Sequence, residues 1–153
     1  MIYLHLFAIF LPVIAFPRNV RIQNTTNCSQ LGRYAFHPEL RNRMATGIMF
    51  HQGKKDTHPS TEYLCALEGM AGLILENPRK PVNCTIDLGI FPLIFESDGK
   101  VDDAYYVSRV ALEALKPHLT SLSVSTGFGC NSVLEDRKHK YLCLFKLDTE
   151  IFP

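Results

Sequence analysis

The sequence lacks an excess of charge of either sign, and it lacks a second long apolar run. Its 16 Lys and Arg residues nearly balance 15 Asp and Glu residues, so the formal net charge is +1. A nearly neutral chain has no strong attraction for nucleic acid or acidic membranes, so neither is an expected partner. Beyond residue 16 no apolar run is long enough to span a bilayer. Internal repeats are also missing, which fits one domain in 153 residues.

The first 16 residues, MIYLHLFAIFLPVIAF, contain no Lys, Arg, Asp or Glu. They form an apolar run that is short for a membrane span and carries the small residue Ala15 near its end. This pattern predicts a secretory signal peptide over residues 1–16, with a membrane anchor as the alternative. We therefore expect a secreted, extracellular protein with an N-terminal extension over residues 17–35 and one domain over residues 36–150.

The cysteine count fits an oxidising compartment. In a secreted chain cysteines are expected to pair, and an odd number predicts two disulfides and one free thiol. The five cysteines are Cys28, Cys65, Cys84, Cys130 and Cys143. Three Asn-x-Ser/Thr sequons also predict glycosylation of a secreted chain. Their acceptors are Asn24, Asn27 and Asn83.

Hydrophobic spacing and turn residues predict helices in the first part of the chain and a pair of strands at the end. Gly47 is expected to end the first helix and Pro117 the third, and the charged segment 131–140 is expected to connect the two strands. The predicted helices cover residues 36–47, 61–77 and 102–117, a short extended segment covers 89–97, and the strands cover 119–130 and 140–147. This order predicts an α+β fold.

Three segments together resemble the CAP superfamily, the cysteine-rich secretory, antigen 5 and pathogenesis-related proteins, and among them the SCP-domain proteins secreted by nematodes. FHPELRNRMATG is similar to the family's first helix, and EYLCALEGMA is similar to the tyrosine, cysteine and leucine-glutamate pattern of the worm proteins. PHLTSLSVSTGFGC keeps the order of the signature that ends in Gly-Cys, and KYLCLF resembles the last strand.

The resemblance implies a shortened α-β-α sandwich with a small antiparallel sheet. It also implies that Cys130 faces Cys143 on the neighbouring strand, which leaves two of Cys28, Cys65 and Cys84 for a second bridge. The family's cleft holds two histidines and two acids that bind a divalent metal in some members. Here only His118 matches, with Glu113 as a possible second ligand, and the chain has no tryptophan at all. One imidazole and one carboxylate make a poor zinc site, so no metal or cofactor is expected.

Two groups of residues are candidates for enzymatic activity. His118 and Glu113 could act as a general acid-base pair in a small secreted hydrolase, such as a ribonuclease-like effector. The hydroxyl residues before Cys130 lack the Gly-x-Ser-x-Gly elbow of a serine nucleophile, so they are expected to lie on the solvent face of a strand.

The first hypothesis is a non-enzymatic secreted protein that binds a host or other extracellular partner, with lipid or sterol as one possible ligand. A disulfide scaffold without a dedicated site is the third hypothesis.

Overall fold

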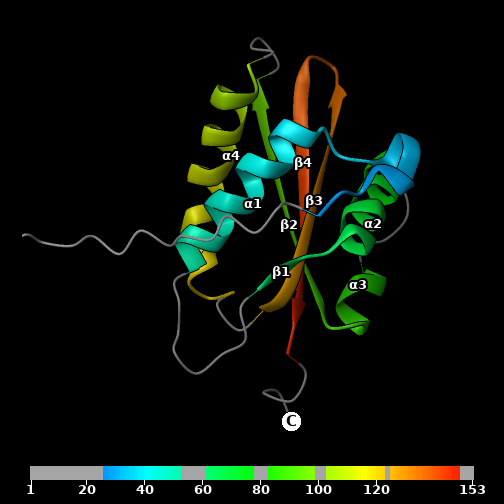
Figure 1. Ribbon diagram of the computed structural model, residues 1–153, viewed down its shortest axis with the longest axis vertical. Helices are drawn as coiled ribbons and strands as arrows, with labels where there is room; N and C mark the ends of the chain where they lie inside the picture. The colour runs from blue at the N-terminus through cyan, green and yellow to red at the C-terminus, as the bar shows by residue number, and fades with distance from the viewer. Residues whose placement is uncertain (1–25, 53–60, 78–82, 99–102, 123–124, 149–153) are drawn as a thin grey trace, which may run out of the picture.

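The computed structural model describes residues 26–52, 61–77, 83–98, 103–122 and 125–148, and the predicted signal peptide lies outside them. One sheet lies between two helical layers, with α1 and α4 on one side and α2 and α3 on the other (Figure 1). The elements are η1 (Ser29–Tyr34), α1 (Pro38–Gln52), β1 (Glu62–Tyr63), α2 (Cys65–Glu76), α3 (Asn83–Asp87), β2 (Ile90–Asp98), α4 (Ala104–Leu119), β3 (Ser125–Glu135) and β4 (Lys138–Leu147). The predicted α+β sandwich is confirmed.

The sheet has the strand order β1-β3-β4-β2. Its three long strands are antiparallel, as expected, while the two-residue β1 pairs in parallel with β3. The prediction had placed Glu62 and Tyr63 in the second helix, which instead begins at Cys65. An extended backbone at Tyr63 directs its side chain into the core, where it is buried.

The connection between β3 and β4 is much shorter than predicted. Only Asp136 and Arg137 separate the two strands, and both have positive φ angles, of 51° and 64°. Two central residues with positive φ are typical of the type I′ turn, whose twist matches that of the flanking strands. The prediction of a long charged loop over residues 131–140 was therefore wrong, because both strands continue through charged residues to the turn and no Gly marks the turn in the sequence.

The edge strand β2 contains a proline without losing a bond of the ladder. The Leu147 N–H donates to the Gly89 carbonyl at 2.9 Å. In an antiparallel pair every second residue directs its N–H and C=O groups toward the partner strand, so this bond fixes which residues of β2 bond to β4. Phe91 and Leu93 then face β4 with their backbone groups, and Pro92 faces the free edge. A residue without an N–H is tolerated at this position because no partner strand needs its donor.

Helix α4 continues past Pro117, although this residue was expected to end it. Proline removes one helical hydrogen bond, and in the last turn the cost of that loss is limited. The next residue on the inner face, Leu119, is fully buried, and Leu122 is nearly so. Because both leucines are buried, the chain continues along the core after Pro117, and β3 begins only at Ser125. Residues 119–122, which were predicted to begin a strand, therefore do not; residues 123 and 124 of that prediction lie outside the described residues.

Helix α1 likewise runs past Gly47, which was expected to end it. A Cβ atom at this position would lie 2.3 Å from Cδ1 of Leu112 on α4. The glycine therefore serves close packing between α1 and α4, and both helices cover the same face of the sheet (Figure 1). Neither η1 nor the short α3 was predicted, because both lack a repeating apolar pattern.

Buried side chains form one cluster on each face of the sheet. The larger cluster lies under α1 and α4 and includes Phe128, Tyr141 and Phe145 from the strands. The smaller cluster lies under α2 and contains Leu142 and Leu144 from β4. Strand residues therefore alternate between the two layers, as the period of two requires. None of the helices in the described part of the chain is long and apolar enough to cross a membrane.

Candidate functional site

The two residues proposed for acid-base chemistry do not converge. Glu113 and His118 both lie on α4 and are both exposed. They are five residues apart on one helix, which separates them by about 140° around its axis. The Glu113 carboxylate lies 3.7 Å from the Lys116 ammonium, and its side chain is 67% exposed. His118, which precedes the predicted strand 119–130, lies in the last turn of α4.

Glu113 instead lines a shallow groove between α1 and α4, and His118 is not among the groove residues. The groove has a volume of about 470 Å³ and is lined by Asn42, Arg43, Thr46, Gly47, His51, Tyr105, Ser108, Arg109, Leu112 and Glu113. Gly47 and Leu112 are among its lining residues, and the glycine lets the Leu112 side chain pack directly against the backbone of α1. Two guanidinium groups, an imidazole, three hydroxyls and one carboxylate therefore lie around this hollow.

Aromatic rings support the two arginines of this groove. The Arg43 guanidinium lies 5.2 Å from the centre of the Tyr105 ring, and the Arg109 guanidinium lies 5.6 Å from that of Tyr106. Both distances fit cation–π contacts. Arg43 also pairs with Glu39 at 3.0 Å one helical turn away. Tyr105 and Tyr106 remain 57% and 42% exposed, so each ring presents a free face or edge to solvent.

A second polar cluster is buried under α2 and centres on Glu68, which is fully buried. Its Oε1 accepts hydrogen bonds from the Phe36 N–H and the Arg41 Nη2, both at 2.7 Å. Its Oε2 accepts from the Arg41 Nε and the Tyr63 hydroxyl, both at 2.6 Å. We call Glu68, Arg41 and Tyr63 the Glu68 clamp, because these contacts connect the segment before α1, α1 itself, β1 and α2.

The pKa values within the Glu68 clamp agree with a fixed ion pair. Hydrogen bonds to Glu68 raise the pKa of Arg41 above its ordinary value. Burial, followed by the hydrogen bond to Glu68, raises the pKa of Tyr63. The tyrosine therefore keeps its proton and donates it, and all four carboxylate contacts are satisfied. Because both oxygens of the Glu68 carboxylate are already bonded, the clamp has no free position for a metal ion, a transferred proton or a substrate. Its role is to stabilise the fold.

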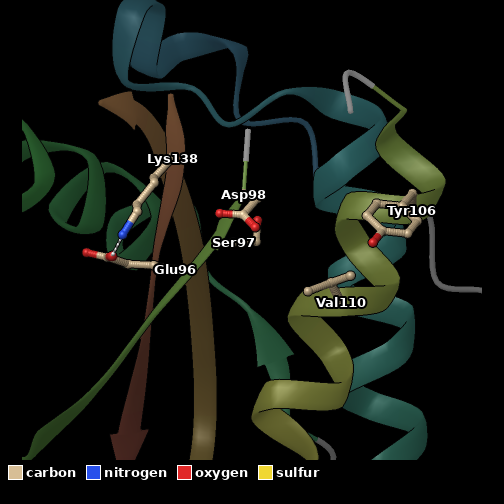
Figure 2. A pocket seen from close by; sticks show the side chains of 6 residues that line it. All are labelled: Glu96, Ser97, Asp98, Tyr106, Val110 and Lys138. Carbon is tan, nitrogen blue, oxygen red and sulfur yellow. Dashed lines mark ion pairs between the residues drawn. The ribbon is translucent and has the colours of Figure 1, made fainter. Parts of the chain in front are cut away.

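A smaller hollow of about 330 Å³ lies at the far end of the sheet, between β2 and α4. Figure 2 shows Tyr106 and Val110 on α4, Ser97 and Asp98 at the end of β2, and the Glu96–Lys138 ion pair on the other side of the strand. The nitrogen and oxygen of this ion pair are 3.8 Å apart. With two carboxylates and one ammonium, the hollow carries a small excess of negative charge.

The described residues contain two disulfides. Cys130 and Cys143 are bonded across β3 and β4, with Cα atoms 4.1 Å apart. Cys28 and Cys65 form the second bridge, which ties the start of η1 to the first residue of α2. The side chain of Cys84 lies outside the described residues, as do Asn24 and the Asn83 side chain. Asn27 is exposed, and its Oδ1 accepts a hydrogen bond from the Ser29 N–H at 3.1 Å.

A metal centre is not assembled by the residues that the structure describes, since no three His, Cys, Asp or Glu side chains come together there. His118 and Glu113, the only residues that the CAP resemblance assigned to a cleft, point to different sides of α4. The described part of the chain therefore offers two surface hollows and one buried clamp. Sequence reasoning found neither hollow, because each is formed by residues that are distant in the sequence.

Comparisons with known proteins identify this architecture. The sequence pattern of the family described as "ASPRs: Ancylostoma-associated secreted protein related" matches residues 28–145. The solved structure "Ancylostoma-secreted protein Ac-ASP-7" matches with a TM-score of 0.55 and 15% identity, over 73% of this chain and 70% of that chain. "Manganese-bound Ac-ASP-7" gives the same values. No curated protein matches. The predicted likeness to CAP-domain proteins is confirmed, and at this identity the structures show the fold alone.

Proposed function

Because this chain belongs to the Ancylostoma-associated secreted protein related family, we propose that it is a secreted, non-enzymatic binding protein. Its partner is an extracellular protein with an acidic surface, and the groove between α1 and α4 receives it. The observation that carries the proposal is that Arg43 and Arg109, which line this groove, each lie against an exposed tyrosine ring. The family name and the two disulfides support secretion.

Arginine and tyrosine are the residue types that contribute most often to protein–protein binding energy. The exposed aromatic residues Phe50, Tyr105 and Tyr106 lie on the same two helices as the arginines, and Phe50 is 79% exposed. A guanidinium held over an aromatic ring loses little conformational freedom when a carboxylate binds it. The groove is open rather than enclosed, so it suits side chains of a protein better than a lipid tail that must be buried.

The proposal is tested with the purified mature protein and synthetic peptides. Peptides with clustered Glu, Asp and aromatic residues are compared with peptides in which Gln and Asn replace the acids, by fluorescence anisotropy at low and high salt. We expect binding of the acidic peptides alone, weaker at high salt because the contacts are exposed. The variant Arg43→Glu with Arg109→Glu should lose at least about tenfold in affinity.

The matched control carries the same change of net charge elsewhere. Arg33→Glu with Lys146→Glu alters η1 and β4, which do not line the groove, and should keep the affinity within about twofold. Equal binding of acidic and neutral peptides, or an unchanged affinity in the groove variant, would overturn the proposal. So would co-sedimentation with neutral phosphatidylcholine and sterol vesicles in the absence of peptide binding, since that result favours a lipid ligand.

A further inference from the structure

The sequon Asn27-Cys28-Ser29 shares its middle residue with the Cys28–Cys65 disulfide. Asn27 and Ser29 are exposed, whereas Cys28 between them is fully buried. The bridge ties this segment to Cys65, the first residue of α2. The folded protein therefore presents the acceptor asparagine at its surface but holds the middle of its recognition sequence in the core.

The backbone around Asn27 is folded back on itself. The Asn27 Oδ1 accepts a hydrogen bond from the Ser29 N–H at 3.1 Å. The Leu31 N–H donates to the Cys28 carbonyl at 3.0 Å. An enzyme that modifies a sequon must bind the asparagine together with the hydroxyl residue two positions later, so this segment has to leave its own contacts first. Local opening breaks hydrogen bonds but not a disulfide, so the bridge keeps the segment beside α2 even when it opens.

We propose that closure of the Cys28–Cys65 disulfide prevents glycosylation of Asn27, so that the glycan is attached only while Cys28 is a thiol. In the transfer, the Asn27 Nδ2 loses a proton and bonds to C1 of the sugar, while C1 separates from the lipid diphosphate that carried it. In the competing step, the two thiols lose two protons and two electrons to the disulfide of an oxidoreductase, which becomes a dithiol. The proposal rests on the secretion proposed above, but not on the partner of the groove.

The opposite order, in which the glycan is attached first, is compatible with the fold. The Asn27 Nδ2, which would carry the glycan, makes no hydrogen bond to the described residues, and the residue is exposed. A glycan on this nitrogen therefore extends into solvent and leaves the disulfide free to close. The segment continues into η1, which packs against α2, on the side of the sheet opposite to the groove between α1 and α4 (Figure 1). A glycan at Asn27 is then attached on the side away from the groove.

A second sequon with the same middle residue offers an internal comparison. Asn83-Cys84-Thr85 begins α3, and the other four cysteines are bonded to one another, so no cysteine of this chain remains to close it. Thr85 is buried, so this sequon reaches an enzyme only when the fold around α3 opens. Modification of Asn83 therefore reports loss of the fold, while modification of Asn27 alone reports release of the bridge.

The test uses the mature protein, produced in bacteria without glycans and refolded with its disulfides, in an Asn24→Gln background that removes the neighbouring sequon. The protein is incubated with purified oligosaccharyltransferase and a lipid-linked oligosaccharide, and the modified fraction of each asparagine is measured by mass spectrometry. We expect no modification of Asn27 in the oxidised protein and modification of a large fraction in the variant Cys65→Ser, which leaves the sequon itself unchanged. Asn83 should stay unmodified in both.

The matched control breaks the other disulfide. Cys143→Ser removes the bridge between β3 and β4 but keeps Cys28–Cys65, so Asn27 should stay unmodified even where Asn83 becomes accessible. This comparison decides the case in which Cys65→Ser loosens the whole fold. Modification of Asn27 in the oxidised protein, its absence in Cys65→Ser, or equal modification of Asn27 in the two variants would overturn the proposal. None of these results depends on acidic peptides binding in the groove, so the two proposals fail independently.

Discussion

The two buried polar clusters of this protein differ in how completely they are bonded. In the Glu68 clamp, four hydrogen bonds of 2.6 to 2.7 Å surround one carboxylate. At the far end of the sheet, Oγ of Ser97, Nε2 of His139 and the hydroxyl of Tyr141 are equally removed from water, and we call these three groups the open trio. None of them makes a full hydrogen bond to the residues described, although the Ser97 hydroxyl is close enough to lower the pKa of Tyr141 in part. A satisfied cluster rigidifies the fold, whereas a poorly satisfied one costs stability. The clamp is therefore expected to contribute more to stability than the open trio.

The largest effect is expected from breaking the Glu68 clamp. Arg41→Met keeps a long side chain but leaves the Glu68 carboxylate buried without its cation. Removing one partner of a buried ion pair costs about 3 to 5 kcal/mol. We therefore expect a loss of that size in the free energy of unfolding, measured by urea denaturation. Arg43→Met on the same helix is the control, because Arg43 and its partner Glu39 are exposed, and should change stability by less than about 1 kcal/mol.

A smaller effect is expected from a change that pushes α2 away from β3. A Cβ atom at Gly129 would lie 2.4 Å from the Glu68 backbone nitrogen and 2.7 Å from the Leu64 carbonyl oxygen. These are backbone atoms, so α2 itself must move. Gly129→Ala should then destabilise the protein by about 1 to 3 kcal/mol, as overpacked cores do. Unchanged thermal unfolding would show that the clamp does not depend on close contact between α2 and the sheet.

Alkaline pH should weaken both clusters through their tyrosines. Burial raises the pKa of Tyr63 and of Tyr141, so the folded state holds both protons at a pH where the unfolded chain, with a tyrosine pKa of about 10, releases them. The unfolded state then binds fewer protons, and stability falls as the pH rises above about 10. The urea midpoint should drop between pH 9 and pH 11, and drop less in Tyr63→Phe than in Tyr105→Phe. Equal drops would contradict this.

The residues that carried the family resemblance are the ones that hold the fold. Tyr63, Cys65 and Glu68 of the EYLCALEGMA segment provide two members of the clamp and one half of a disulfide. The sandwich was therefore predictable, because residues close in sequence define α2 and its contacts. The resemblance implied that Cys130 faces Cys143, and the register of β3 and β4 places these two residues opposite one another.

The candidate sites were not predictable in the same way. His118 stood out as a histidine near a signature, yet the burial of Leu119 and Leu122 keeps it on a helix that faces solvent. The groove is lined by residues of α1 and α4, such as Gly47 and Leu112, which are far apart in the chain. The open trio depends on the register that places Ser97 opposite His139, and no single segment contains that information.

Comparison of two matched tyrosine variants tests the account most directly. Tyr63→Phe and Tyr141→Phe each delete one hydroxyl from a ring that is at least 95% buried, and their free energies of unfolding can be measured by urea denaturation under one set of conditions. The account predicts a loss of about 1 to 3 kcal/mol for Tyr63→Phe, because Glu68 loses a donor, and a smaller loss for Tyr141→Phe, whose hydroxyl makes no full hydrogen bond. Equal losses in the two variants would show that both clusters are bonded alike and would contradict the distinction between the clamp and the open trio.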